Sequence, residues 1–164
     1  MPDNALQSQE VYERFLYTLP MHYPIIRRST LVYIPSDPLF GRMEGFLLFD
    51  AQLVLCVSEQ LSFLGQGEIA GYGYEVSRSQ MTHDELVQFS AAAYCGAVYD
   101  YKEKLYWYDS FAHPNNPDLA STHPHHKHVH PDIKHNRIPA PDLSFTRPNL
   151  PFLLAEMEPL LVAL

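Results

Sequence analysis

The sequence lacks the features that mark several large classes of protein. No apolar run approaches the roughly 20 residues that span a bilayer. The first ten residues have neither the charged nor the apolar region of a signal peptide. We therefore expect a cytoplasmic protein with no membrane partner. A P-loop, a GxGxxG motif and a GxSxG motif are also absent, which argues against the nucleotide-binding and hydrolase sites that those motifs build.

Cysteine is scarce, since Cys56 and Cys95 are the only two in 164 residues. Both lie inside apolar segments, "LVLCV" and "AAAYCGAV". Buried cysteine usually behaves as a small hydrophobic residue, and disulfides are rare in the cytosol. We therefore expect two buried free thiols and no disulfide or redox pair.

Basic charge is also limited, because the formal net charge is −8. This balance argues against strong nonspecific binding to nucleic acid. Several of the cations nevertheless gather beside a run of histidines, at Lys127, Lys134, Arg137 and Arg147. This segment is expected to form a local positive patch that becomes more positive as the histidines take up protons.

The segments that are present predict a single α+β domain. Tyrosine and phenylalanine are abundant, and short runs of apolar and aromatic residues follow one another with only brief connections. Such connections exclude parallel crossovers, so the sheet should be mainly antiparallel, with five or six strands. Strands are expected at 29–34, 42–50, 52–63, 69–79, 91–101 and 104–111. Two hairpins are expected, one turning at 50–51 and the other at 102–103.

Helices are expected on either side of the sheet segments. Residues 5–18 are amphipathic and should end at Leu19-Pro20, while residues 150–164 form an apolar C-terminal helix that Pro159 kinks or ends. A short helix at 81–89 is predicted by the capping-box spacing of Thr82 and Glu85. The chain divides into a helix and sheet at 1–111, an extended His/Pro-rich loop at 112–149 and the C-terminal helix, which packs on the sheet or on another protomer.

The histidine run in "STHPHHKHVHPDIKHNR" (121–137) is the strongest candidate for a functional site. In an extended chain, His126, His128 and His130 share one face, and His123, His125 and Lys127 share the other. The residue types allow three interpretations: a metal site, a metal-free site for phosphoryl chemistry, or a polar loop that faces water.

The metal interpretation needs a carboxylate beside the imidazoles, because no cysteine is near. Asp132, Asp109 or Glu59 could supply it. One candidate set is Glu59, His126 and His128, holding a divalent metal such as zinc or manganese. Glu59, however, interrupts an apolar strand and is more simply placed on the solvent-facing side of the sheet.

The metal-free interpretation needs no cofactor. RNA cleavage requires a base for the 2′-hydroxyl, an acid for the leaving oxygen and cations for the phosphate. Neighbouring imidazoles disfavour each other's charge, so one can stay neutral while another is protonated.

A resemblance to a known family adds to these observations. In "YDYKEKLYWYDSFAHPNNPDLASTHPHHKH" the sequence resembles the TumE family of toxins from toxin–antitoxin modules. The resemblance rests on Tyr99 and Tyr101, on Tyr108-Asp109, on His113 and on the string Pro-His-His-Lys-His at 124–128. Family members commonly have an arginine just before the Tyr-Asp pair, where this chain has Trp107. The resemblance implies a toxin with a cognate antitoxin.

Together these observations predict a toxin-like endoribonuclease, with RNA as substrate and a homodimer as one option for its assembly. His126 and His128 are the base and acid candidates in either order, and Lys127 contacts phosphate. His125, His113 and Asp109 orient the imidazoles or complete the site. The candidates for substrate binding are Tyr101, Tyr108, Lys134 and Arg137. The alternatives are a metal-dependent nuclease or phosphodiesterase, including one that acts on a cyclic nucleotide, and an interaction domain without catalysis.

Overall fold

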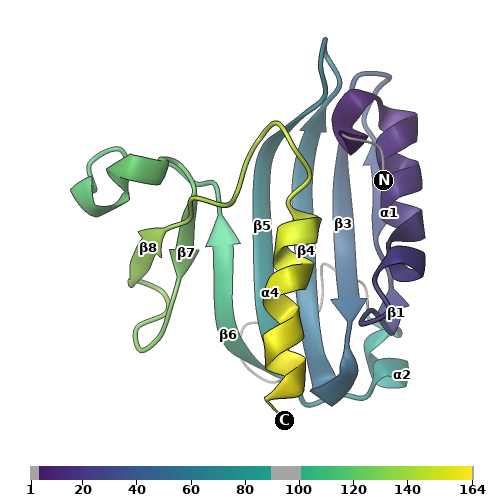
Figure 1. The fold of residues 1–164 in the computed structure, drawn as a ribbon, viewed down its shortest axis with the longest axis vertical. Coiled ribbons are helices and arrows are strands. Elements are labelled where there is room, and N and C mark those ends of the chain that lie inside the picture. The colour runs from purple at the N-terminus through teal and green to yellow at the C-terminus, as the bar shows by residue number, and fades with distance from the viewer. Residues whose placement is uncertain (1–3, 90–100, 164) are drawn as a thin grey trace.

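The computed structural model describes residues 4–89 and 101–163. It contains an antiparallel sheet with two longer helices on one of its faces (Figure 1). The strands are β1 (Arg28–Ser29), β2 (Val32–Pro35), β3 (Phe40–Leu48), β4 (Leu53–Ser62), β5 (Glu68–Ser79), β6 (Lys102–Asp109), β7 (His126–His128) and β8 (Arg137–Pro139). The helices are α1 (Gln9–His22), α2 (His83–Leu86) and α4 (Leu150–Val162), with short 3-10 turns η1 (Ala5–Gln7), η2 (Asp50–Gln52) and η3 (Pro117–Thr122).

The predicted α+β class is confirmed, but the described residues form eight strands where five or six were expected. The order is β1-β3-β4-β5-β6-β7-β8, with β2 also paired to β3. One extra strand arises because the expected strand 29–34 divides into β1 and β2. Gly45 on β3 has φ +145°, and a Cβ there would lie 2.6 Å from the Thr30 carbonyl oxygen, so the two backbones approach too closely for a regular ladder. The other two, β7 and β8, come from the segment expected to be a loop.

The core lies between the sheet and the helices. Side chains alternate along β4, so that Leu53, Leu55, Val57 and Leu61 join a cluster with buried residues of α1 and α4. Burying one such side chain contributes roughly 1.5–3 kcal/mol. The position of α4 over the sheet confirms that the apolar C-terminal segment packs on it.

Both prolines expected to interrupt helices lie inside them. Helix α1 continues through Pro20 to His22, and α4 continues through Pro159 to Val162. Each proline lies within the last turn of its helix, so few helical hydrogen bonds remain for it to disrupt. The N–H of Tyr23 still donates to the Leu19 carbonyl, and that of Ala163 to the Pro159 carbonyl. The predicted end of α1 was therefore too early, whereas α4 continues past Pro159 within the predicted range of 150–164.

The two predicted hairpins have different outcomes. Strands β3 and β4 form the first, and their tight connection includes Ala51 with φ 56°. The second hairpin was expected to turn at Lys102 and Glu103, but both residues lie within β6, where they pair with β5. Its other predicted strand, 91–101, falls almost wholly on residues that the structure does not describe. The capping box of α2 is present as predicted.

The prediction of free thiols was wrong for Cys56, which is disulfide-bonded. Its apolar surroundings on β4 suited a thiol and a half-cystine equally, so the argument from burial could not separate them. Cys95 lies outside the described residues. Within residues 4–89 and 101–163, no helix is both long and apolar enough to cross a membrane.

Candidate functional site

Antiparallel pairing of β6 and β7 brings one aspartate and two histidines together. Asp109 lies opposite His126, and Trp107 lies opposite His128. Alternate residues of a strand share a face, so these four side chains share one face of the sheet. Tyr108, between them in sequence, points to the other face and donates its hydroxyl hydrogen to Glu156 on α4. The cluster therefore lies on the face that α1 and α4 leave open (Figure 1).

Three side-chain atoms converge in this cluster. Nε2 of His126 lies 3.1 Å from Oδ1 of Asp109, and Nε2 of His128 lies 3.1 Å from Oδ2. The two Nε2 atoms are themselves 3.1 Å apart. Among the described residues these three form the one group of histidine, cysteine or acidic side chains close enough to share a metal ion. We call Asp109, His126 and His128 the three-residue centre.

Backbone carbonyls set the tautomer of both histidines. Nδ1 of His126 lies 3.0 Å from the Pro124 carbonyl, and Nδ1 of His128 lies 3.0 Å from the Ile133 carbonyl. A carbonyl oxygen only accepts hydrogen bonds, so each Nδ1 must carry the hydrogen. A neutral ring then presents a bare lone pair at Nε2. Both lone pairs point at the Asp109 carboxylate. Because two lone pairs and a carboxylate repel one another, a positive charge among them is needed to stabilise the centre.

The pKa values within the centre agree with this need. Burial alone raises the pKa of Asp109, but hydrogen bonds from His126, His128 and the Phe111 N–H outweigh it and hold that pKa well below its usual range. Burial lowers the pKa of His126, yet the bond to Asp109 and the Pro124 carbonyl reverse this and leave it raised. The carboxylate therefore stays ionised and attracts a cation, which is either a proton on Nε2 or a metal ion.

Neighbouring residues fix the orientation of the centre. The Trp107 ring stacks on His128 with centroids 4.0 Å apart, and its Nε1–H donates to Oδ2 of Asp109 over 3.2 Å. The Phe111 backbone N–H donates to Oδ1 over 2.9 Å. His126 and His128 are only 1% and 3% exposed, whereas the Asp109 side chain is 26% exposed. A ligand therefore reaches the centre from the aspartate side.

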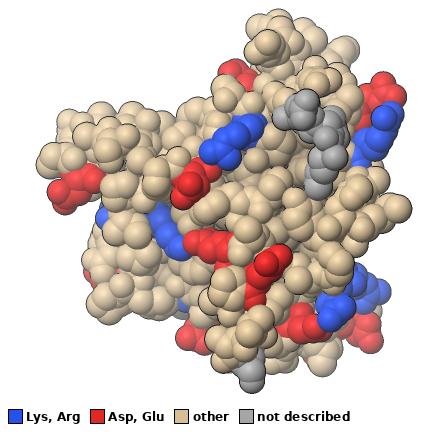
Figure 2. Space-filling model, in the orientation of Figure 1, with Lys and Arg blue, Asp and Glu red and all other residues tan. Residues whose placement is uncertain are grey.

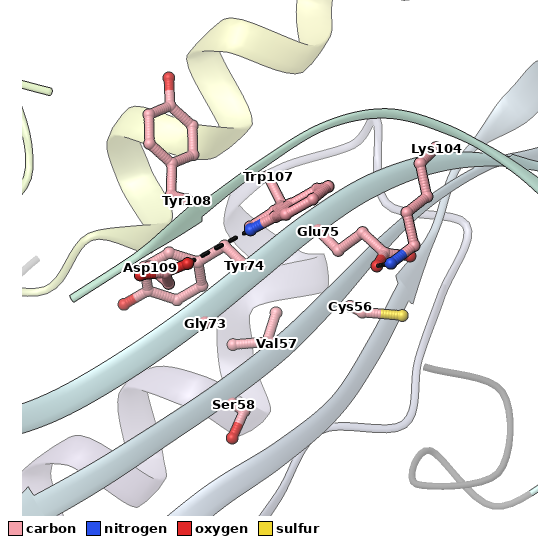
Figure 3. Close-up of a pocket in the computed structure, with 10 residues that line it drawn as sticks. All are labelled: Cys56, Val57, Ser58, Gly73, Tyr74, Glu75, Lys104, Trp107, Tyr108 and Asp109. Carbon is pink, nitrogen blue, oxygen red and sulfur yellow. Dashed lines mark hydrogen bonds and ion pairs between the residues drawn. The ribbon is translucent and has the colours of Figure 1, made fainter. Parts of the chain in front are cut away.

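A cavity opens on that side. It has a volume of about 260 Å³ and lies on the open face of the sheet (Figure 3). Asp109 and Trp107 stand at one end and Glu75 and Lys104 at the other (Figure 3). Gly73 lies between them, and a Cβ added there would meet no atom within 4 Å. The glycine thus keeps open the space beside the carboxylate.

His113 and Arg137 complete the surroundings of the centre. The His113 ring meets the edge of His126 with centroids 4.9 Å apart. Burial and the nearby charges of Arg137 and His126 lower the pKa of His113, so its neutral form is favoured. The structure thus brings together four of the candidate side chains, His113, Asp109, His126 and His128.

Other predicted site residues lie elsewhere. Lys127 points to the helix-covered face, where its Nζ lies 2.6 Å from Oε1 of Glu156. His125 shares that face and lies 2.7 Å from the Tyr72 hydroxyl. Both follow from the alternation of β7. Tyr108 is buried against α4, and Tyr101 contacts the Phe89 ring beyond the far end of β6.

Glu59 does not face solvent and does not join the histidines. It is 0% exposed and accepts hydrogen bonds from the hydroxyls of Tyr12 and Tyr74, the second over 2.6 Å. Asn149 donates in turn to the Tyr74 hydroxyl. Burial raises the pKa of Glu59 to about 7, although the two tyrosines oppose the rise. The solvent-facing prediction was wrong because the hydroxyls of Tyr12 and Tyr74 provide hydrogen-bond partners for Glu59 on the helix side.

Two aromatic residues near the centre were not predicted as site residues. Trp107 stacks on His128, and Phe111, two residues after the end of β6, carries an exposed ring. The available signal was their position on either side of Asp109, since strand ends commonly carry site residues.

Comparison with known proteins gives one family. A family model described as Toxin TumE matches residues 21–161, which is more than half of the chain and includes the three-residue centre. No curated protein and no solved structure matches the chain.

Proposed function

The chain belongs to the TumE family of toxins, and on that premise we propose that it cleaves RNA at a divalent metal ion held by Asp109, His126 and His128. Membership of the family implies a toxin of a toxin–antitoxin module and a cognate antitoxin as partner. RNA as the target, and metal-dependent cleavage as the reaction, are our proposals.

The convergence of three acceptor atoms is the observation that supports a bound metal ion. A proton on one Nε2 satisfies at most two of them, whereas a metal ion satisfies all three. Zinc–nitrogen bonds of about 2.0–2.1 Å at a tetrahedral angle place two imidazole nitrogens about 3.3 Å apart. The Nε2 atoms here are 3.1 Å apart before any ion is considered. Backbone carbonyls on both Nδ1–H groups are the outer contacts that metal-binding histidines usually have.

Two imidazoles and one carboxylate leave coordination positions open for water and substrate. A metal ion held by these three residues would supply Lewis-acid stabilisation of the charge on the phosphate. RNA supplies its own nucleophile: the 2′-oxygen bonds to phosphorus while the bond from phosphorus to the 5′-oxygen breaks. The proton that leaves the 2′-hydroxyl goes to a base, and the departing 5′-oxygen takes a proton from an acid.

His113 is placed to exchange one of these protons. Its lowered pKa favours the neutral ring, which accepts a proton near neutral pH. It lies beside His126 at the edge of the centre and is only half-buried. Arg137 also lies near His126 and supplies positive charge for the phosphate.

The metal-free reaction predicted from the residue types remains a second proposal. It is favoured by the raised pKa of His126, which keeps a proton on Nε2 next to Asp109. In that version His126 and His128 are themselves the acid and base. Their burial and their mutual orientation favour the metal-dependent version, because neither ring has a nitrogen directed at open space.

An RNA cleavage assay tests the proposal and separates the two versions. Protein stripped with EDTA should leave a mixed RNA pool intact, and added Zn²⁺ or Mn²⁺ should restore cleavage. His126→Ala should abolish the metal-restored activity. His135→Ala is the matched control, because that exposed histidine contacts Asp132 and not the centre. Cleavage that persists in EDTA supports the metal-free version, and RNA that stays intact under every condition rules out both.

Assembly is a separate question. We propose a homodimer as an option alongside binding to the antitoxin. Val162 at the end of α4 is exposed, and Leu160 and Leu161 are only partly buried. Light scattering after size exclusion should give twice the 18.8 kDa chain mass for a dimer; the mass of one chain would exclude it.

A further inference from the structure

Positive charge without a carboxylate partner lies on both sides of the three-residue centre. We propose that the open face of the sheet binds single-stranded RNA along a track that crosses the centre, so that cleavage is internal to the strand. RNA as the ligand rests on the proposed function. The track itself rests on two cavities, on the cations Lys134 and Arg137 and on the exposed ring of Phe111.

The first cavity lies before Asp109 along β6. It has a volume of about 530 Å³, and Lys104, Trp107, His130 and Lys134 are among the residues that line it. Lys104 pairs with Glu75 over 2.9 Å. Lys134 is exposed and makes no ion pair with any residue that the structure describes. This cavity therefore holds a lysine whose charge is available to an anion.

The same cavity is tied to the centre. Trp107 forms part of its wall and stacks on His128. Ile133, also in the wall, supplies the carbonyl that accepts from Nδ1 of His128. An anion bound beside Lys134 thus lies in a cavity that shares its wall with the centre.

The second cavity lies beyond Asp109. It has a volume of about 470 Å³ and is lined by residues 112–116, which include His113, together with Arg137. Within the described ranges Arg137 makes no ion pair, and its Nε has no hydrogen-bond partner. The positive charge of Arg137 lies close enough to His113 and His126 to disfavour the protonation of both rings. Phosphate is the natural partner for a guanidinium in this setting.

Phe111 precedes the residues of the second cavity in sequence, and its ring meets that of His113 with centroids 5.5 Å apart. Its side chain is 71% exposed, and its backbone N–H holds Asp109 in place. An exposed ring beside an anion site offers a surface on which a base can stack. Stacking requires a base that is free of its own neighbours, which duplex RNA does not supply. The ring therefore favours a single strand.

The extent of the track excludes a single nucleotide as the natural ligand. Lys104 lies five positions before Asp109 on β6, which corresponds to roughly 16 Å at the rise of an extended strand. The second cavity adds to this length. On the helix-covered face acidic and basic side chains are interspersed (Figure 2), and a cavity of about 320 Å³ there has its lysine, Lys127, paired with Glu156. A bound strand would thus have nucleotides on both sides of the centre.

Binding to an uncleavable probe tests the track without relying on catalysis. A fluorescently labelled 2′-O-methyl oligonucleotide lacks the nucleophile, and EDTA removes metal. Fluorescence anisotropy over a series of salt concentrations then gives the dependence of affinity on salt. Lys134→Gln and Arg137→Gln should each reduce the log–log slope by about 0.7, the value for one lost contact to a single strand. Arg14→Gln, on α1 at the other face, is the matched control and should leave the slope unchanged.

Two further comparisons use the same assay. Phe111→Ala should weaken binding of the single strand about 5- to 150-fold, the range for losing one stacked base. Affinity should rise with length from a dinucleotide to an octanucleotide, and the matching duplex should bind more weakly. Slopes equal to that of the control, or equal binding of duplex and single strand, would overturn the track. A protein that binds as described but leaves RNA intact with every metal would keep the track and lose the proposed function.

Discussion

The buried carboxyl of Glu59 allows a quantitative test of the fold. Burial raises its pKa from 4.5 to about 7, and it is enclosed by Tyr12 and Tyr74 without a cation among its partners. Each unit of pKa difference between folded and unfolded states corresponds to about 1.4 kcal/mol. Ionising Glu59 therefore costs about 3 kcal/mol more in the folded protein than in the unfolded chain.

The sign of the effect follows from which state holds the proton. Between pH 4.5 and 7 the folded protein binds a proton at Glu59 that the unfolded chain has released. The free energy of unfolding must then fall as pH rises through this window. The contribution is complete below the unfolded pKa and lost above about pH 7. Between pH 5 and pH 8 the loss amounts to about 2.5 kcal/mol.

Glu59→Gln isolates this contribution. The amide is neutral at every pH, and it can accept from one tyrosine and donate to the other. Urea unfolding of both proteins at pH 5 and pH 8, followed by circular dichroism, gives the two differences in free energy. From pH 5 to pH 8, the free energy of unfolding of the variant should increase by about 2.5 kcal/mol relative to that of the wild type. A stability difference that is the same at pH 5 and pH 8 would refute the reasoning, whatever its size.

Three other predictions concern the site. His128→Ala should abolish stoichiometric zinc binding in calorimetry, whereas His135→Ala should leave it intact; binding that survives in both would assign the metal to the surrounding histidines. Lys127→Met should remove the 2.6 Å ion pair with Glu156 yet retain RNA cleavage, since that side chain lies on the helix-covered face; loss of cleavage in a folded variant would show that it acts in the reaction. Saturating zinc should raise the unfolding free energy by about 2.7 kcal/mol at 100 times its dissociation constant; an unchanged unfolding curve would mean that the folded protein holds no zinc.

Local sequence patterns predicted the parts of the structure that depend on near neighbours. The two-residue period placed His126 and His128 on one face, and the capping box located α2. Asp109 was named from the sequence as a possible carboxylate beside the imidazoles. Its pairing with His126 depends on the register of β6 and β7, and that register is a long-range property.

The failures have the same origin. Glu59 looked solvent-facing because its partners, the hydroxyls of Tyr12 and Tyr74, come from other elements of the fold, α1 and β5. Lys127 looked like a phosphate ligand by residue type, but alternation along β7 directs it to the other face. Alternation in an extended chain had already placed Lys127 and His125 on the face opposite His126 and His128, but only the pairing of β7 shows that this face is the one covered by α4.

The nature of the centre can be measured directly. X-ray absorption spectroscopy of protein loaded with one equivalent of zinc reports the ligands that surround the ion. Two imidazole nitrogens and a carboxylate oxygen at about 2.0–2.2 Å, with the imidazole signal lost in His126→Ala, are the predicted result. Three or more imidazoles, or a spectrum that the variant leaves unchanged, would contradict it, because the ion would then belong to the exposed histidines and not to Asp109, His126 and His128.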